Sequence, residues 1–285
     1  MEYRQFGQTG MRLSVVALGG LLARYEGACG HPPPEEKRAI YLRAADLGLN
    51  LFDMGYGDEV HIPNELKGNA ENRHFSLKVG APRAEDLEGL VEKHLSNLRR
   101  DAIDILRVHH YAYLQDNQLA ERITILKQQG KVRSLCLIRH YQTDQKAYAE
   151  HGPEVDADAD LVIYNYVCRW QEQGIRQSSE AQKGVLIMKA LGGQWIGWEE
   201  QTRTDWIYAT KEKVVELAPR GEAMRPDLDL VYPIVAGPWH KLAQPGELMP
   251  RTERAIQWVL VNRGVSSVLV AVASVDELEE ALGIQ

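Results

Sequence analysis

The feature that most constrains this sequence is a regular alternation of short apolar runs with segments of helical periodicity. Apolar runs occupy 12–20, 49–54, 74–80, 102–110, 132–140, 159–167, 184–191 and 266–274. Segments with helical apolar spacing occupy 35–48, 85–100, 118–130, 253–264 and 275–283, and Gly130 is predicted to end the third of them. Strands that alternate with helices pair in parallel, so the pattern predicts an α/β fold.

Eight candidate strands in 285 residues suit a closed (β/α)₈ TIM barrel. The rival is a doubly wound open sheet, which would carry a GxGxxG turn after its first strand. This chain has only "ALGG" at 17–20. No linker divides the sequence, so we predict one domain over 1–285, with a long, Trp-rich loop insertion around 192–250.

Charge and composition exclude several classes of partner. The net charge is -7 and no basic stripe is evident, which disfavours nucleic acid. No apolar run reaches the ~18 residues of a membrane span, and "MEYRQFGQTG" lacks the apolar region of a signal peptide. Cys29, Cys136 and Cys168 form no metal-ligand pattern. We expect a cytoplasmic protein that acts on a small molecule without a metal, nucleic acid or membrane partner; its oligomeric state is not readable.

Polar side chains with acid–base chemistry end three consecutive apolar runs. Asp53 ends the run 49–54 and Tyr56 follows in the Gly-rich turn "GYG". Lys78 lies near the end of the next run, and His109 ends the one after it. In a parallel barrel the active site lies at the carboxyl ends of the strands, so these four side chains would meet at one mouth.

Together these side chains could reduce a carbonyl group. An ammonium beside a tyrosine stabilises the phenolate and lowers the pKa of the phenol, and Asp53 would hold Lys78 charged and oriented. Tyr56 could then protonate a carbonyl oxygen that His109 orients. No side chain donates hydride, so a nicotinamide cofactor would be needed. Each residue alone has a structural alternative as a cap, a turn residue or a snorkelling lysine; their succession on three strands favours function.

At these residues the chain resembles the aldo-keto reductase superfamily, as a divergent member of bacterial type. The opening "YRQFGQTGMRLSVVALGG", the strand-two segment "GLNLFDM…YG" and "SLKVG" are similar to family motifs. So are "DAIDILRVHH", with Asp104 five residues before His109, and the closing "AIQWVLVNRGVSSVLVAVASVDELEEAL". The resemblance spans nearly the whole chain.

The resemblance implies a TIM barrel that reduces aldehydes or ketones with NADPH, or with NADH. It implies that Tyr56 is the general acid, that Lys78 and Asp53 tune it, and that His109 orients the substrate oxygen. Cofactor contacts are expected from four positions at the later strands and the last helix: Arg139, Asn165, Ser274 and Glu280.

Several positions depart from the family pattern. Two residues separate Asp53 from Tyr56 where family members usually have four, and "CLIRH" stands where a Gly-x-Ser-Asn-like run usually binds the carboxamide. Glu277 aligns with the arginine that the family places near the adenosine 2′-phosphate. Two alternatives therefore stay open: a non-redox enzyme that transfers protons with the same side chains, and a non-catalytic binding or regulatory barrel.

Overall fold

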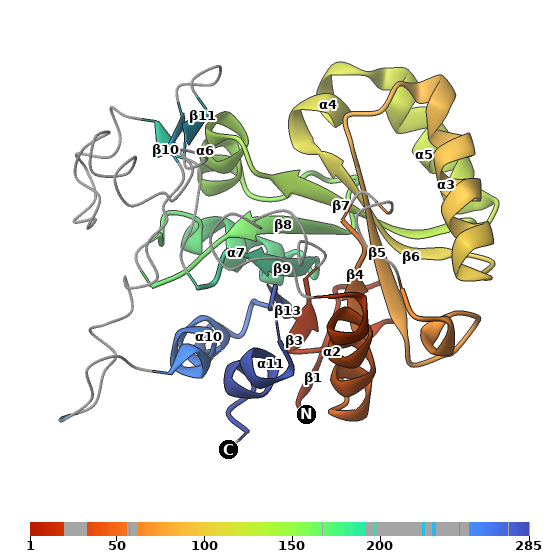
Figure 1. Ribbon diagram of the computed structural model, residues 1–285. Coiled ribbons are helices and arrows are strands. Elements are labelled where there is room, and N and C mark those ends of the chain that lie inside the picture. The colour runs from red at the N-terminus through yellow and green to blue at the C-terminus, as the bar shows by residue number, and fades with distance from the viewer. Residues whose placement is uncertain are drawn as a thin grey trace.

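The computed structural model describes most of the chain. The described residues are 1–19, 33–55, 57, 62–166, 168–191, 245, 251–272 and 274–284, together with the backbone of 196–197, 224–225 and 230–231. Their core is a closed barrel of eight parallel strands, as the sequence predicted (Figure 1). The predicted insertion at 192–250 lies outside the described residues, except for residue 245 and three two-residue strands.

The barrel strands run in the order β13, β3, β4, β5, β6, β7, β8, β9. Their bounds are β3 Val16–Leu18, β4 Leu51–Asp53, β5 His74–Gly80, β6 Ile103–His109, β7 Val132–Arg139, β8 Ala159–Ile163, β9 Gly184–Met188 and β13 Ser267–Val270. Outside the barrel, β1 (Tyr3–Gln5) pairs with β2 (Arg12–Ser14), and β10 (Ile196–Gly197) and β11 (Met224–Arg225) flank β12 (Leu230–Val231).

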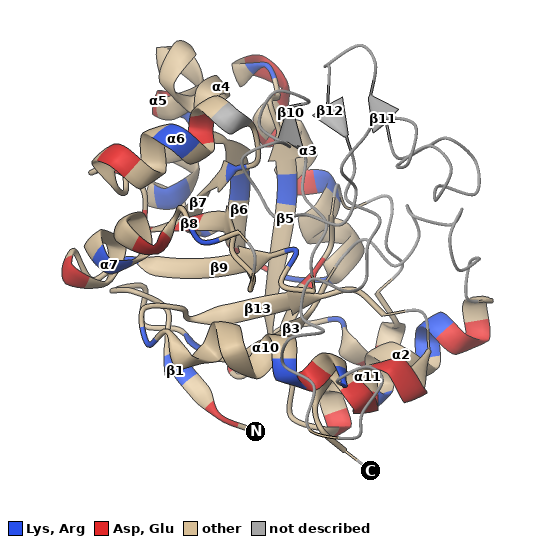
Figure 2. Ribbon diagram, turned by 90° about the vertical axis from the view of Figure 1, so that its left-hand side faces the viewer, with Lys and Arg blue, Asp and Glu red and all other residues tan. Residues whose placement is uncertain are grey.

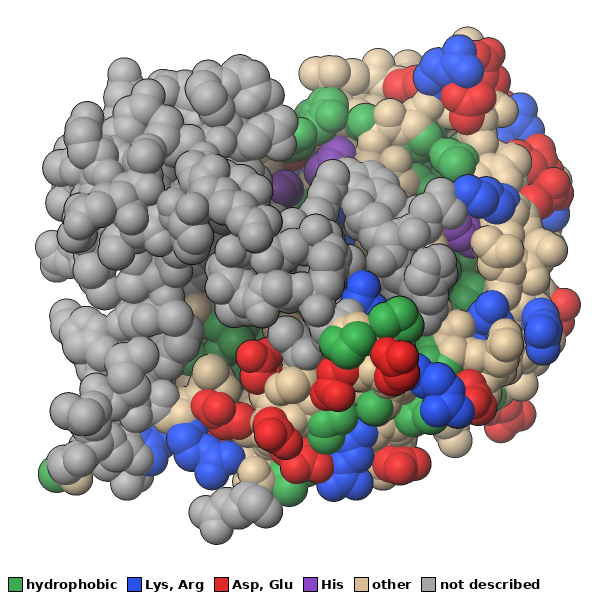
Figure 3. Space-filling model, in the orientation of Figure 1, with side chains coloured by type: hydrophobic (Ala, Val, Ile, Leu, Met, Phe, Trp, Pro, Cys, Tyr) green, Lys and Arg blue, Asp and Glu red, His purple; other side chains and the backbone are tan. Residues whose placement is uncertain are grey.

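Helices surround the barrel (Figure 1). They are α2 Pro34–Asp46, α3 Ala84–Leu98, α4 His110–Gln115, α5 Asn117–Gln128, α6 Gln142–His151, α7 Glu172–Glu180, α10 Thr252–Val261 and α11 Val275–Ala281, with a 3-10 turn η1 at Asn64–Leu66. The prediction for Gly130 is confirmed: it follows α5 with a left-handed φ of 73°. Acidic and basic side chains are interspersed over the face formed by α2, α10 and α11 (Figure 3). No described helix has the length and apolarity needed to cross a bilayer.

Along every barrel strand except β5, apolar residues belong to two separate clusters. Leu51, Ile105, Cys136, Leu161 and Leu186 are among the residues of the cluster that fills the barrel. Their strand neighbours pack outward with helix side chains in the larger cluster. This period of two fixes which polar residues can face the inside of the barrel.

The first predicted strand, 12–20, is divided in the structure. Residues 12–14 pair antiparallel with Tyr3–Gln5, whereas 16–18 pair in parallel with β13 and β4. The buried Asn50 side chain accepts from the Ser14 N–H at 2.7 Å and donates to the Arg12 carbonyl at 2.8 Å. These bonds satisfy the backbone where the chain leaves the hairpin for the barrel.

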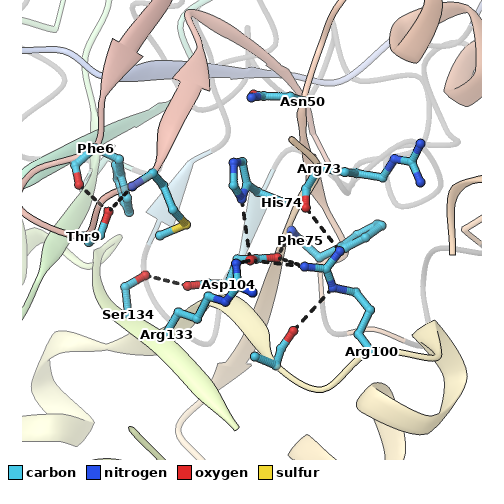
Figure 4. Close-up of polar contacts among 12 residues, drawn as sticks. Phe6, Thr9, Asn50, Arg73, His74, Phe75, Arg100, Asp104, Arg133 and Ser134 are labelled. Carbon is cyan, nitrogen blue, oxygen red and sulfur yellow. Dashed lines mark hydrogen bonds and ion pairs between the residues drawn. The ribbon is translucent and has the colours of Figure 1, made fainter. Parts of the chain in front are cut away.

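A buried ionic network lies around the fully buried Asp104 on β6 (Figure 4). Its carboxylate accepts from Arg100 Nη2 at 3.1 Å, Arg133 Nη1 at 2.9 Å and the Phe75 N–H at 2.8 Å. Asp104 stands at the second residue of β6, at the strand's N-terminal end. That end of a barrel is associated with stability, so this part of the family-like motif is structural.

Candidate functional site

Every second residue of a barrel strand faces the interior, and this alternation places six polar side chains at the carboxyl end of the barrel. Asp53 follows Leu51 at the inward spacing, and Arg107 and His109 follow Ile105. Lys78 pairs in register with Arg107. His140 and Asn165 continue the inward parity of β7 and β8. Three of the four predicted catalytic residues therefore occupy one mouth.

Asp53 is held by an arginine that the sequence reasoning did not single out. Its Oδ1 accepts from Arg107 Nη2 across β5, and it also accepts from the Gly55 N–H at 2.9 Å. Both side chains of the pair are buried. The sequence analysis named Lys78 as the partner of Asp53; the contact that the structure shows is with Arg107. Arg107 lies two residues before His109 in "ILRVHH", so both side chains face the same side of the strand. This spacing is the signal that could have identified Arg107.

The turn after Asp53 is built on two glycines in left-handed conformations. Gly55 has φ 54° and Gly57 has φ 82°. A Cβ on Gly57 would lie 2.1 Å from Cε1 of His94, so α3 packs directly against this turn. Tyr56 lies between the two glycines but outside the described residues. Its role as general acid stays a prediction.

Lys78 is half-buried on β5. Its charge acts on His109 at the end of the next strand, β6. The basic positions of β5 and β6 lie side by side in Figure 2. Burial first, then the charges of Lys78 and Arg107, lower the pKa of His109 to about 4. His109 is therefore a neutral imidazole at physiological pH, the form that can share a hydrogen bond with a substrate oxygen.

Aromatic rings line the same mouth around His109. The centroid of its ring lies 5.6 Å from that of Tyr111, 5.3 Å from Tyr141 and 6.5 Å from His140. The neighbouring His110 contacts Asp144 Oδ1 at 3.0 Å and Glu154 Oε1 at 2.9 Å instead. Of the two consecutive histidines, His109 is thus the one that belongs to the mouth.

Two further cationic or titratable groups lie at the mouth, and Lys189 was not singled out from the sequence. Lys189 follows the last residue of β9, and His140 follows the last residue of β7. Burial first, then the charges of Lys189 and Lys78, hold the pKa of His140 well below its usual range. A lysine inside the apolar run "LIMKAL" is the signal that could have identified Lys189.

The predicted cofactor residues on β7 and after β8 have buried structural contacts. Arg139 is fully buried, and its Nε donates to Asp160 Oδ1 at 2.7 Å beneath the ring of Tyr148. Arg139 stands at an outward-facing position of β7, away from the barrel interior. Asn165 donates from Nδ2 to the Lys189 carbonyl at 3.0 Å and accepts from the Cys168 N–H at 2.9 Å.

The other two predicted cofactor residues are tied to helix termini. Ser274 is the N-cap of α11 and accepts from the Glu277 N–H at 3.1 Å. Glu280 accepts from the N–H of Thr252, the first residue of α10, at 3.0 Å. The carboxylate of Glu36 also accepts from the Val275 N–H at 3.0 Å, so a negative charge already contacts the start of α11.

The described residues contain no group of three His, Cys, Asp or Glu side chains able to hold a metal ion. The described residues bring ammonium, guanidinium, carboxylate and imidazole groups to the mouth. Such a set can bind an oxygen atom, orient it and stabilise negative charge on it.

The chain is similar over nearly its whole length to known proteins. The chain is 24% identical over 314 residues to an L-galactose dehydrogenase of Arabidopsis thaliana, covering 98% of this chain and 86% of the relative. It is 24% identical over 315 residues to an L-glyceraldehyde 3-phosphate reductase of Escherichia coli O157:H7, with the same two coverages. An aldo-keto reductase from Bacillus halodurans, solved in apo form, shares the fold with a TM-score of 0.64 at 17% identity, over 99% of this chain and 89% of that one.

The match to a family model is nearly as long as the chain. The family described as Aldo/keto reductase family matches residues 17–285, which include all of the barrel strands but Val16 of β3, and the whole mouth described above. The sequence-based fold class and family resemblance are both confirmed. The chain belongs to the aldo/keto reductase family of oxidoreductases.

Proposed function

We propose that the protein reduces an aldehyde or ketone with a nicotinamide cofactor, using Tyr56 as the proton donor. The observation that carries this proposal is the neutral, buried His109 at the end of β6. It lies within the electrostatic reach of Lys78, and the turn that holds Tyr56 begins at Asp53 on the same rim. Family membership supports the reaction class.

Each residue has one task in this proposal. His109 shares a hydrogen bond with the carbonyl oxygen and holds it at the mouth. Lys78 stabilises negative charge that develops on the oxygen and on the phenol of Tyr56. Asp53, fixed by Arg107 and by the Gly55 N–H, anchors the start of the turn that carries Tyr56.

Members of this family typically use NAD(P)H, and the donor groups on the rim suit the neutral parts of such a cofactor. A carboxamide or ribose pairs with amide and hydroxyl groups such as those of Asn165 and Ser274. A bound nicotinamide supplies the hydride. The carboxylate of Glu36 accepts from the Val275 N–H at the start of α11, and Asp276 and Glu277 lie in the first turn of that helix. Acidic residues gather on α11 in Figure 2, an arrangement that repels an additional 2′-phosphate.

The test is reduction of a carbonyl panel followed by the loss of NADPH or NADH absorbance. The panel contains 4-nitrobenzaldehyde and L-glyceraldehyde 3-phosphate, and L-galactose is assayed in the oxidative direction with NAD(P)⁺. We expect turnover of at least one compound that depends absolutely on the cofactor. Turnover without added nicotinamide would instead support the proton-transfer alternative.

The matched variants are Tyr56→Phe and Tyr113→Phe. Both remove one phenolic hydroxyl, but Tyr113 is a half-buried residue of α4 outside the mouth. Tyr56→Phe should lower kcat by about a hundredfold or more, the usual contribution of a positioned general acid. Tyr113→Phe should stay close to the unsubstituted protein.

A further inference from the structure

Two buried glutamines, Gln145 and Gln171, form an amide pair behind the mouth. Gln145 belongs to α6, Gln171 directly precedes α7, and both side chains are buried. Gln171 donates from Nε2 to Gln145 Oε1 at 2.9 Å, and Gln145 donates from Nε2 to the His140 carbonyl at 2.8 Å. The amide pair therefore links the start of α7 to the residue that follows β7 at the mouth.

Further buried contacts continue from Gln171 to the ends of β8 and β9. The Cys168 thiol lies 3.7 Å from Gln171 Oε1 as a donor, and the Cys168 N–H donates to Asn165 Oδ1 at 2.9 Å. The Asn165 amide donates in turn to the Lys189 carbonyl at 3.0 Å. One series of buried hydrogen bonds thus connects the carboxyl ends of β7, β8 and β9.

The donors and acceptors of the amide pair fit together in only one orientation. The His140 carbonyl can only accept, so Gln145 has to present its amide nitrogen to it. The Gln145 oxygen then faces Gln171, which has to present its own nitrogen. Turning either amide over would place two oxygens against each other in a buried setting. A pair with a single allowed orientation holds the His140 backbone in one place.

The helix that Gln171 precedes does not account for its side chain. Gln171 is the N-cap of α7, a position where Ser, Thr, Asp and Asn are preferred because their side chains accept from the first helical turn. The Gln171 side chain makes no such bond. It donates to Gln145 on α6 instead. The side chain therefore serves the contact between the two helices behind the mouth and not the helix terminus.

Gln145 contacts both residues whose rings lie beside His109 on the β7 side of the mouth. The His140 ring is nearly parallel to that of His109, at an interplanar angle of 11° and a centroid distance of 6.5 Å. The Tyr141 ring lies 5.3 Å from that of His109, and the Tyr141 carbonyl accepts from the Gln145 N–H at 2.9 Å. A displacement of Gln145 would therefore displace two of the rings against which His109 packs.

We propose that Gln171 and Gln145 are positioning residues of the reduction: acting through His140 and Tyr141, they hold the His109 ring where it meets the substrate oxygen. This inference rests on the proposed function, because it assigns a task in the same reaction. A misplacement of about 1 Å at a reacting group can cost about a hundredfold in rate, so a smaller shift of His109 should still be measurable.

The experiment compares Gln171→Met with Gln171→Glu on the best carbonyl substrate of the panel, at saturating cofactor. Gln171→Met keeps the length of the side chain but removes both hydrogen-bonding groups, and it should lower kcat about tenfold at every pH. Gln171→Glu restores a donor to Gln145 Oε1 only when its carboxyl is protonated, a form that burial favours. Its kcat relative to the unsubstituted protein should therefore recover as pH falls from 8 to 5. Gln128→Met, at an exposed position of α5, is the matched control and should keep the full kcat.

Three outcomes decide the inference. Recovery by Gln171→Glu at any pH in this range, together with the loss in Gln171→Met, supports it. An unchanged kcat in folded Gln171→Met overturns it. Equal losses in both variants at every pH also overturn it, because the side chain would then contribute packing alone. If Gln171→Met does not fold, Gln145→Met takes its place, since it removes the donor to the His140 carbonyl directly.

A readout without turnover separates failure of this inference from failure of the proposed function. The imidazole signals of His109 and His140 are followed by NMR in histidine-labelled protein and assigned with His109→Asn and His140→Asn. Gln171→Met should move both sets of signals, and Gln128→Met should move neither. If the protein reduces no carbonyl compound but both sets move, the proposed function fails and the positioning of His109 by the amide pair stands. Signals that stay in place in Gln171→Met overturn the inference.

Discussion

Asp53 on β4 and Arg107 on β6 form a buried ion pair over the intervening strand β5. The pair ties the start of the Tyr56 turn to the strand that ends in His109. It is also a charge interaction inside the barrel, where removal of one partner leaves the other without compensation.

Asp53→Asn should therefore destabilise the protein strongly. It removes the carboxylate but leaves the buried guanidinium of Arg107, for which the expected loss in free energy of unfolding is about 3–5 kcal/mol. Urea unfolding at pH 7 measures it. The double variant Asp53→Asn with Arg107→Met removes both charges and should be more stable than the single variant. A loss below about 1 kcal/mol for Asp53→Asn would show that the pair has little energetic weight.

His109 should make stability depend on pH. Its pKa is about 4 in the folded protein against about 6.5 when unfolded, so the unfolded chain binds more protons between these values. The stabilising contribution of the neutral ring is complete above about pH 6.5 and is lost as pH falls towards 4. Between pH 7 and 5 the free energy of unfolding should fall by about 2 kcal/mol more in the unsubstituted protein than in His109→Asn. His151→Asn, at an exposed position of α6, is the control and should keep the full pH dependence.

The Asp104 network should affect stability much more than catalysis. Asp104 is fully buried at the N-terminal end of β6, contacted by Arg100 and Arg133. Asp104→Asn should cost about 3–5 kcal/mol of unfolding free energy, with kcat/KM nearly unchanged below the melting temperature. Asp101→Asn changes an exposed aspartate close by in sequence and should cost less than about 1 kcal/mol. A large loss of kcat/KM in folded Asp104→Asn protein would contradict the assignment of stability to the N-terminal end of the barrel and of catalysis to its carboxyl end.

The carboxylates at the start of α11 should weaken the binding of NADPH relative to that of NADH. We expect NADH to bind at least as tightly as NADPH in fluorescence titrations, since Glu277 and Asp276 lie in the first turn of α11. Glu277→Arg should improve NADPH binding relative to NADH by about tenfold. Glu71→Arg, an exposed change of the same charge, should leave the ratio unaltered. A strong NADPH preference in the unsubstituted protein would place the 2′-phosphate elsewhere.

The positions of the strands were within reach of the sequence because apolar runs and helical spacing alternate so regularly. The predicted run 74–80 coincides with β5, and 132–140 differs from β7 by one residue. The break at Val15 was not foreseen, because "RLSVVAL" contains no Gly or Pro that would mark the point where the hairpin ends and the barrel strand begins. The short helix α4 was missed because His110–Gln115 has too few turns to show a period.

The site was harder to predict than the fold because it depends on which residues face inward across different strands. Asp53, Lys78 and His109 could be chosen since each ends an apolar run. The partner of Asp53 could not be chosen without the register that brings Arg107 alongside Lys78. The left-handed φ of Lys189 was not predicted, because a lysine does not signal that conformation as a glycine would.

The most direct measurement of the central claim follows deuterium from the cofactor to the product. NADH or NADPH carrying deuterium at C4 is mixed with 4-nitrobenzaldehyde, and the alcohol is analysed by mass spectrometry in single-turnover time courses. We predict deuterium at the alcohol carbon, formed about a hundredfold more slowly by Tyr56→Phe at unaltered cofactor affinity. An alcohol without deuterium, or equal rates for Tyr56→Phe and the unsubstituted protein, would contradict the account.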